Sequence, residues 1–308
     1  MRRRGLNIRK ALLGSILPML RVLPPKVASR VVAGIGQAEY TLRPGVRQRM
    51  DAAVARGSGY FGGHWDIQAV GRGLAGNQIR WRVRDRLLDG LTDATVAPLF
   101  EVEGRAGLND ALARGRGVVL LCTHFGAHMM PAHWLVREDY PLRLFMERPR
   151  SISRFLSRQF ETDGPLGQRK LFISRRASPA ESAGSILRAA RILRSGSLVM
   201  IAGDVRWSGP NTALASFLGR RYTFSTTWVT LAAVSGAPVV PVFCRMRADG
   251  TFGLEFLEPY EIPPEAQCPE AAAPWVQGAL RDVEERVCRH PDNSNDYFFW
   301  PEPTDAVA

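Results

Sequence analysis

Gly-Val-Val-Leu-Leu-Cys-Thr-His-Phe-Gly, residues 117–126, is the stretch that decides the fold of this 308-residue chain. Its apolar run lies between a glycine and a polar pair, and a short run bounded in this way is typical of a strand buried on both faces. His124 then stands directly after a buried strand, which is where open α/β sheets hold their ligands. The stretch therefore predicts a sheet and a site at one edge of it.

Similar apolar runs recur along the chain, with helical patterns between them. The predicted buried strands are 142–146, 198–202 and 239–243. A further strand at 252–257 alternates polar and apolar residues, so we expect it at an edge of the sheet. The predicted helices are 182–194, 227–235 and 273–288. This alternation predicts an α/β fold with a largely parallel central sheet flanked by helices.

The first third of the chain is predicted to be helical, including 26–36 and 77–88. Within it, the apolar stretch 11–20 is shorter than the roughly 18–20 residues that span a bilayer. Its apolar residues recur at helical spacing beside a basic flank: Leu12, Leu13, Ile16, Leu17 and Leu20. This pattern favours an anchor lying in the membrane interface; a helix packed on the domain and a signal peptide are the alternatives. We expect 1–60 to be a membrane-associating helical segment and 61–308 the α/β domain.

The charge balance points to an anionic partner. Lys plus Arg number 41 against 29 for Asp plus Glu, a formal net charge of +12, and only three of the basic residues are lysines. Guanidinium groups pair with phosphate and carboxylate in bidentate fashion. Lipid headgroups, a phosphopantetheine carrier, coenzyme A and nucleic acid would all fit this charge. The sequence contains no recognisable nucleic-acid-binding module, so nucleic acid is not the expected partner.

Residues 123–130, Thr-His-Phe-Gly-Ala-His-Met-Met, hold the most suggestive chemistry. We expect a helix to begin at Gly126, which would bring free backbone N–H groups next to His124. An acyl-transfer site needs a base and hydrogen-bond donors that stabilise the developing oxyanion. His124 and His128 are four residues apart, as in some zinc helices, but the glutamate of that motif is missing. We therefore expect no metal and no organic cofactor.

A family resemblance rests on several stretches that follow one another in the family's order. They are 102–104, 111–126, Arg176, 182–194, the stretch 196–204 that ends at Asp204, 217–220, 236–242 and 258–259. Together these stretches resemble the lipid A biosynthesis lauroyl/myristoyl acyltransferases, a branch of the lysophospholipid acyltransferase superfamily. The resemblance implies an α/β acyltransferase fold and a catalytic motif of His, four residues, then Asp or Glu.

The chain departs from that catalytic motif. His124 matches the histidine, but Met129 stands where the acid is expected. A carboxylate in such a pair orients the imidazole and stabilises its charged form. Asp204 is the first candidate to replace it and Glu147 the second, whereas His128 could donate a hydrogen bond but no negative charge.

The resemblance also implies residues that bind substrate. Arg148, which precedes a proline as in the family, is expected to hold an anionic group of the acceptor. Arg206 and Arg220 are further candidates for binding anions, with solvated surface arginine as the alternative. Gly126 is expected to lie against the substrate.

These observations predict transfer of a fatty acyl chain from an acyl carrier protein or coenzyme A thioester to a hydroxyl or amine of a membrane lipid or glycolipid. His124 would act as general base, supported by Asp204. Four dispersed cysteines suit a reducing compartment, so we expect the protein at the cytoplasmic face of a bacterial inner membrane, bound peripherally or monotopically. The alternative is a lipid-binding or scaffolding pseudoenzyme that keeps the fold without the catalytic pair.

Overall fold

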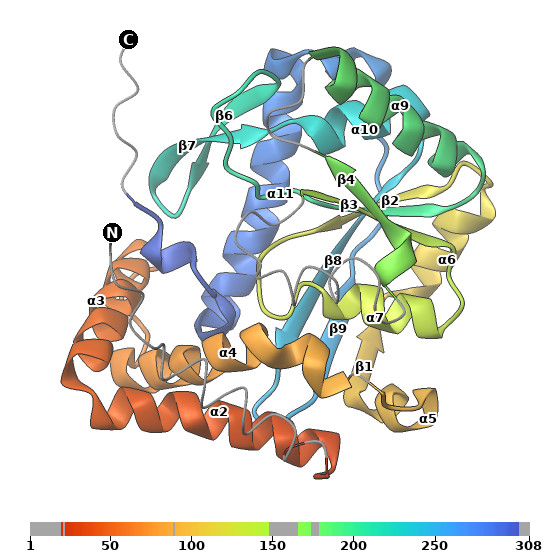
Figure 1. Ribbon diagram of the computed structural model, residues 1–308. Helices are drawn as coiled ribbons and strands as arrows, with labels where there is room; N and C mark the ends of the chain where they lie inside the picture. The colour runs from red at the N-terminus through yellow and green to blue at the C-terminus, as the bar shows by residue number, and fades with distance from the viewer. Residues whose placement is uncertain (1–19, 21, 89, 148–165, 174–178, 302–308) are drawn as a thin grey trace, which may run out of the picture.

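The computed structural model describes residues 20–301 except 21, 89, 148–165 and 174–178 (Figure 1). The expected anchor, apart from Leu20, therefore lies outside the described residues, as do Arg148 and Arg176. The main helices are α2 Pro25–Leu42, α3 Pro44–Tyr60, α4 Ile67–Leu88, α5 Asp93–Val96, α6 Arg105–Ala113, α7 Met130–Arg137, α9 Pro179–Arg194, α10 Thr227–Ser235 and α11 Pro269–Arg289. The strands are β1 Phe100–Glu103, β2 Val118–Cys122, β3 Leu142–Glu147, β4 Lys170–Ile173, β5 Leu198–Ala202, β6 Thr212–Phe217, β7 Arg220–Ser225, β8 Val239–Met246 and β9 Phe252–Phe256.

A seven-stranded sheet forms the centre of the molecule, in the order β1-β9-β8-β2-β5-β3-β4. All its neighbouring strands are parallel except β8 and β9. The predicted α/β class and the largely parallel sheet are confirmed. β2 lies in the middle because every one of its five residues is buried, so both of its faces must be covered.

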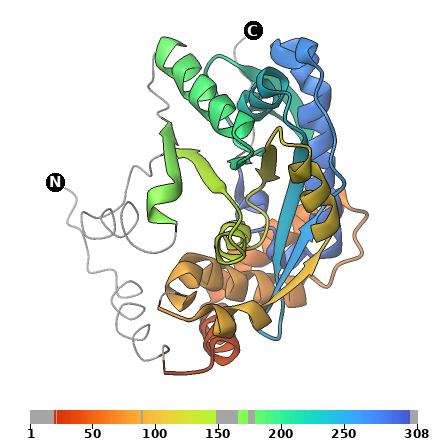
Figure 2. The ribbon, with the colours of Figure 1, turned by 90° about the vertical axis from the view of Figure 1, so that its right-hand side faces the viewer.

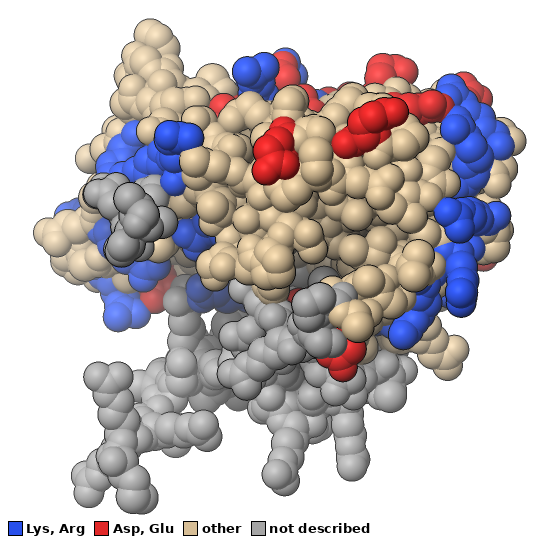
Figure 3. All heavy atoms as spheres, turned by 90° about the horizontal axis from the view of Figure 1, so that it is seen from above, with Lys and Arg blue, Asp and Glu red and all other residues tan. Residues whose placement is uncertain are grey.

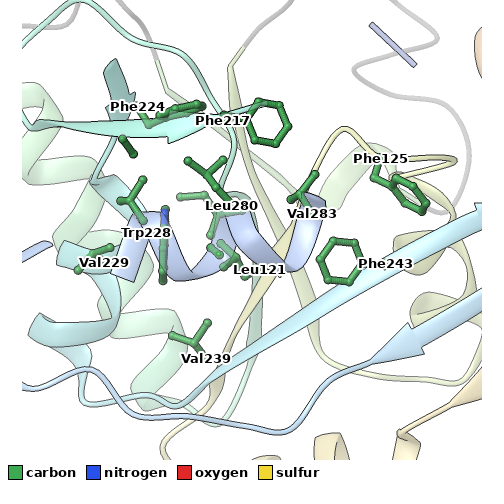
Figure 4. Packing of buried hydrophobic residues seen from close by; sticks show 14 of the residues in the cluster. Leu121, Phe125, Phe217, Phe224, Trp228, Val229, Val239, Phe243, Leu280 and Val283 are labelled. Atoms are coloured by element: carbon green, nitrogen blue, oxygen red, sulfur yellow. The ribbon is translucent and has the colours of Figure 1, made fainter. Parts of the chain in front are cut away.

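Two hydrophobic cores cover the two faces of this sheet. Leu121 and Val199 face a core closed by α9, α10 and α11, while Leu120 and Met200 face another closed by α6 and α7. Figure 4 shows the first core, where Leu121 lies among side chains of α10, α11 and the β6–β7 hairpin. The alternation of side chains along each strand thus divides one apolar run between two cores.

The expected edge position of 252–257 is wrong. β9 lies between β8 and β1, so β1 forms that edge of the sheet. The alternation arises because Glu255, on the polar face, pairs with Arg286 of α11 at 2.7 Å. A strand face that is covered by a charged residue of a helix shows the same alternation of polar and apolar residues as a face open to solvent.

The hairpin of β6 and β7 was not predicted from the sequence. It forms a separate two-stranded antiparallel sheet that packs on α11. Leu218 and Gly219 have φ values of 50° and 76° at its tip, as a tight turn with positive φ requires.

The N-terminal helices α2 and α3 pack on α4, below the sheet in Figure 1. Figure 2 shows the same layer of helices from the side. Leu20, Ala28 and Val32 pack against Ile79 and Val83 of α4 in a small separate core. Within the described part of the chain, no helix combines the length and the apolar character that crossing a bilayer needs.

On the face shown in Figure 3, the basic residues lie in separate groups near the margins of the view, with uncharged and acidic side chains between them. The described basic residues seen on this face therefore do not form one continuous patch.

Candidate active site

His124 and Asp204 meet because they extend two neighbouring parallel strands by the same distance. Cys122 of β2 pairs in register with Ala202 of β5, and each functional residue lies two positions further along its own strand. Nδ1 of His124 is 2.9 Å from Oδ1 of Asp204, and the backbone N–H of His124 donates to Oδ2 at 2.8 Å. The sheet register therefore sets the geometry of the pair.

Asp204 is held as a carboxylate by the groups around it. The residue is buried, and burial alone would raise its pKa. The charge of His124 and hydrogen bonds from His124 and Tyr297 outweigh that effect, so the pKa of Asp204 is lowered. The Tyr297 hydroxyl donates to Oδ2 at 2.6 Å, and burial together with this carboxylate keeps the pKa of Tyr297 well above its usual value. A charged Asp204 accepts a hydrogen bond from the N–H at Nδ1 of His124, which leaves Nε2 as the basic nitrogen.

The segment after α11 holds the turn that carries His124. Asn295 donates from its side-chain amide to the carbonyl oxygens of His124 and Gly126, both at 2.6 Å. The backbone N–H of Gly126 donates in turn to the carbonyl of Asn293 at 2.8 Å. Sequence reasoning missed Asn295 and Tyr297. The signal that could have found them is the polar Asn-Ser-Asn at 293–295, directly before an aromatic tail.

The expected helix start at Gly126 is wrong, because α7 begins at Met130. Gly126 has a φ of +53°, which interrupts a right-handed helix, and a Cβ there would lie 2.1 Å from the carbonyl oxygen of Cys244. Its own N–H is engaged by Asn293, and the N–H of Ala127 donates to the Cys244 carbonyl at 2.7 Å. In this conformation these two groups therefore bind the protein's own backbone rather than a substrate.

The side chain of Phe125 anchors the His124 turn in the hydrophobic core. This side chain is 2% exposed and meets the ring of Phe243 edge-on, with centroids 6.2 Å apart (Figure 4). His124 beside it keeps 46% of its side chain exposed. The turn thus anchors Phe125 in the core and leaves the preceding residue, His124, in the wall of a cavity.

That cavity has a volume of about 350 Å³. His124 lies in its wall together with Met129 and Glu147. Most of the remaining wall is apolar, with contributions from Leu144, Met146, Ile186, Met200, Ile201, Val205 and Trp207. Its polar groups come from Ser182, Ser185, Asn211, Ser225 and Thr227. A mostly apolar pocket with a few polar groups and an imidazole in its wall suits a ligand with an apolar chain.

His128 also lines the cavity, directly beside His124. The two imidazole centroids are 4.9 Å apart. On the other side, Nε1 of Trp81 donates to Nδ1 of His128 at 3.2 Å. His128 is therefore oriented from α4, the helix that carries Trp81.

The other predicted site residues that the structure describes lie in different places. Glu147 lies in the cavity wall, but the carboxylate at Nδ1 of His124 is that of Asp204. Arg206 packs over the rings of Trp300 and Tyr222, at 4.3 and 5.6 Å from their centroids, and burial lowers its pKa. Arg220 belongs to the β6–β7 hairpin, outside the cavity wall formed by the described residues. These described residues include no cluster of three His, Cys, Asp or Glu side chains that could hold a metal ion.

The fold and the site together define an α/β protein in which a His–Asp pair, at the carboxyl ends of parallel strands, opens on a mostly apolar cavity. The sequence pattern of the bacterial lipid A biosynthesis acyltransferases matches residues 82–299. The match covers well over half of the chain, from α4 to the aromatic tail, so the chain belongs to this family. A search of curated proteins finds no match.

Proposed function

We propose that this protein transfers a fatty acyl chain from an acyl carrier protein or coenzyme A thioester to a hydroxyl or amine of a membrane lipid or glycolipid. The family supports acyl transfer in general. The observation that carries the proposal is the 2.9 Å contact between His124 and Asp204, because it directs the basic Nε2 away from the carboxylate.

In the proposed reaction, Nε2 of His124 takes the proton of the acceptor as its oxygen or nitrogen attacks the thioester carbonyl. The tetrahedral intermediate then expels the thiolate, which takes the proton from the imidazolium. Asp204 stabilises the imidazolium between the two steps. No acyl-enzyme forms, and the apolar wall around Leu144 and Met200 receives the first carbons of the acyl chain.

Binding of the acceptor is proposed to use the polar side chains of the cavity and a cationic residue. Asn211, Ser225 and Thr227 supply hydrogen-bonding groups. Arg148, outside the described residues, remains the proposed ligand for an anionic headgroup on the strength of the resemblance alone. The proposed site of action is the cytoplasmic face of the bacterial inner membrane, with the protein bound peripherally.

The test combines a purified enzyme with the lipids of a deletion strain. His124→Ala should lower acyl transfer by about 10²–10⁴-fold, the usual effect of removing a general base. Mass spectrometry of lipids from a deletion strain should show one acyl chain missing, which would identify both the acceptor and the chain length. An unchanged rate in folded His124→Ala protein would overturn the mechanism.

The second candidate is a lipid-binding pseudoenzyme, and the observation that favours it is Met129 in the cavity wall, at the position where the resemblance predicts the acid. The two functions differ in the behaviour of the wild type. A pseudoenzyme would bind acylated lipid without transferring any chain, and Asp204→Asn would leave that binding unchanged.

A further inference from the structure

We propose that His128 is a catalytic residue that donates a hydrogen bond from Nε2 to the thioester carbonyl oxygen as that oxygen becomes negative. This inference deepens the proposed acyl transfer and rests on it. The site would then contain two histidines with different roles: His124 as the general base and His128 as the group that polarises the carbonyl of the thioester.

The hydrogen bond from Trp81 fixes which nitrogen of His128 carries the hydrogen. An indole N–H can only donate, so Nδ1 of His128, 3.2 Å away, must act as the acceptor. In a neutral imidazole with Nδ1 as acceptor, the hydrogen is on Nε2. Trp81 thereby sets the tautomer in which His128 acts as a donor through Nε2, much as partner groups set the tautomer of catalytic and metal-bound histidines.

In this conformation, three backbone N–H groups of the turn already bind groups of the protein itself. The N–H groups of His124, Gly126 and Ala127 are engaged by Asp204, Asn293 and Cys244. Those three groups would have been the natural oxyanion donors at the end of β2. A side chain beside His124 can donate in their place, and His128 lies in the cavity wall with its ring centroid 4.9 Å from that of His124.

The chemistry balances with two histidines in different roles. As the acceptor attacks, its proton moves to Nε2 of His124 and the carbonyl π electrons move to oxygen, where the N–H of His128 stabilises them. Re-formation of the carbonyl expels the thiolate, which receives the proton from His124. His128 keeps its hydrogen throughout, as a neutral imidazole can when it polarises a carbonyl. Its ring need not gain a positive charge beside the imidazolium of His124.

The experiment compares variants that keep or remove the donor. His128→Gln retains an N–H near the place of Nε2, whereas His128→Phe keeps a ring but no donor. We expect kcat to fall about 10²–10³-fold in His128→Phe, the loss typical of one oxyanion donor. We expect a KM within a few-fold of wild type and partial recovery of kcat in His128→Gln. His64→Phe, an exposed histidine outside the cavity, is the matched control and should leave kcat unchanged.

A second measurement does not depend on activity. The ¹⁵N chemical shifts of His128 should show an unprotonated Nδ1 and a protonated Nε2 in wild type, with a mixture of tautomers in Trp81→Phe. A hydrogen on Nδ1 in the wild type would overturn the proposal, as would full kcat in a folded His128→Phe protein whose wild type is active. A change confined to KM would mean that His128 only binds substrate, which also overturns it. A wild type without any transferase activity would instead overturn the proposed function, and the role of His128 with it.

Discussion

Nδ1 of His124 and Oδ1 of Asp204 lie 2.9 Å apart, although 80 positions separate the two residues in the chain. The histidine follows one strand and the aspartate follows the strand beside it, and the register of the two strands brings them level. Because the carboxylate comes from the neighbouring strand, His124 does not need an acid five residues further along the chain, where the sequence resemblance led us to expect one. Met129 in that position is therefore compatible with a complete His–Asp pair.

The first prediction concerns this pair. Asp204→Asn should reduce kcat by up to about 10⁴-fold, as the equivalent change does in the serine protease triad, because a neutral amide cannot stabilise the imidazolium. Glu147→Gln should retain most of the activity, and Met129→Glu should not increase it. The measurement is acyl transfer by the four proteins side by side. Equal activity of wild type and Asp204→Asn would mean that His124 works without an acid.

The second prediction concerns Tyr297. Tyr297→Phe removes the 2.6 Å hydrogen bond to Asp204, which helps to lower the pKa of that carboxylate. The pKa of Asp204 should therefore rise, and the pH profile of its protonation, followed by the ¹³C chemical shift of the carboxyl carbon, should move to higher pH. The free energy of unfolding should fall by about 1.5–3 kcal/mol, the usual contribution of a hydrogen bond to a charged group. Phe299→Leu, in the same tail but not bonded to Asp204, serves as the control, and an identical pH profile in both variants would contradict the prediction.

The third prediction concerns acid stability. Because the pKa of Asp204 is lower in the folded protein than in the unfolded chain, its charge stabilises the fold above the unfolded pKa of about 3.9. That contribution is lost as the pH falls through the folded pKa. The unfolding free energy of the wild type, relative to that of Asp204→Asn, should thus be constant near neutrality and should decrease in acid. Denaturant titrations at a series of pH values would measure it, and a difference that does not change with pH would contradict the assignment.

The fourth prediction concerns Gly126. Gly126→Ala should destabilise the protein and abolish activity together, because the new Cβ would lie 2.1 Å from the Cys244 carbonyl at a φ of +53°. Strain of this kind costs about 1–3 kcal/mol at a single position. Gly184→Ala, where the added carbon meets nothing within 4 Å, is the control in a helix. Thermal unfolding of the two variants would reveal the difference, and equal melting temperatures would contradict it.

The fifth prediction concerns membrane binding. Val27 and Val31 lie one helical turn apart on α2 and are 39% and 40% exposed. Placing Glu at both positions should weaken binding to anionic vesicles at least about tenfold, since burying one valine contributes about 1.5 kcal/mol. Leu214→Glu, at an exposed leucine on β6, is the matched control. Removal of residues 1–23 should also shift the protein toward the soluble fraction, and vesicle binding that survives both changes would place the contact elsewhere.

The sequence was sufficient to predict the parts of the fold that bury apolar runs on two faces. β2 and β5 were found in this way because a strand in the centre of a parallel sheet must be apolar throughout. The four-residue strands β1 and β4 are too short to leave a pattern. The β6–β7 hairpin was missed because its small buried residues, Ala213 and Ala215, alternate with exposed ones and give no strong apolar signal.

The site was only partly predictable for a different reason. His124 could be placed because it follows a predicted strand, and Asp204 was the first candidate for its acid. No sequence rule, however, gives the order of strands that makes β2 and β5 neighbours. The bond from Asn295 to the carbonyl of His124 joins residues 171 positions apart, and such contacts exist only once the sheet has closed. Trp81 beside His128 was not predicted for the same reason.

The support that residues 293–297 give to the His124 turn has a consequence for the order in which the protein is made. Every strand of the central sheet ends by Phe256, and α11, which covers one face of the sheet, ends at Arg289. Synthesis therefore adds Asn295 and Tyr297, which hold the His124 turn and Asp204, after the sheet and its covering helix. A nascent chain that stops before these residues would thus have every strand of the sheet but none of the contacts by which they hold the His124 turn.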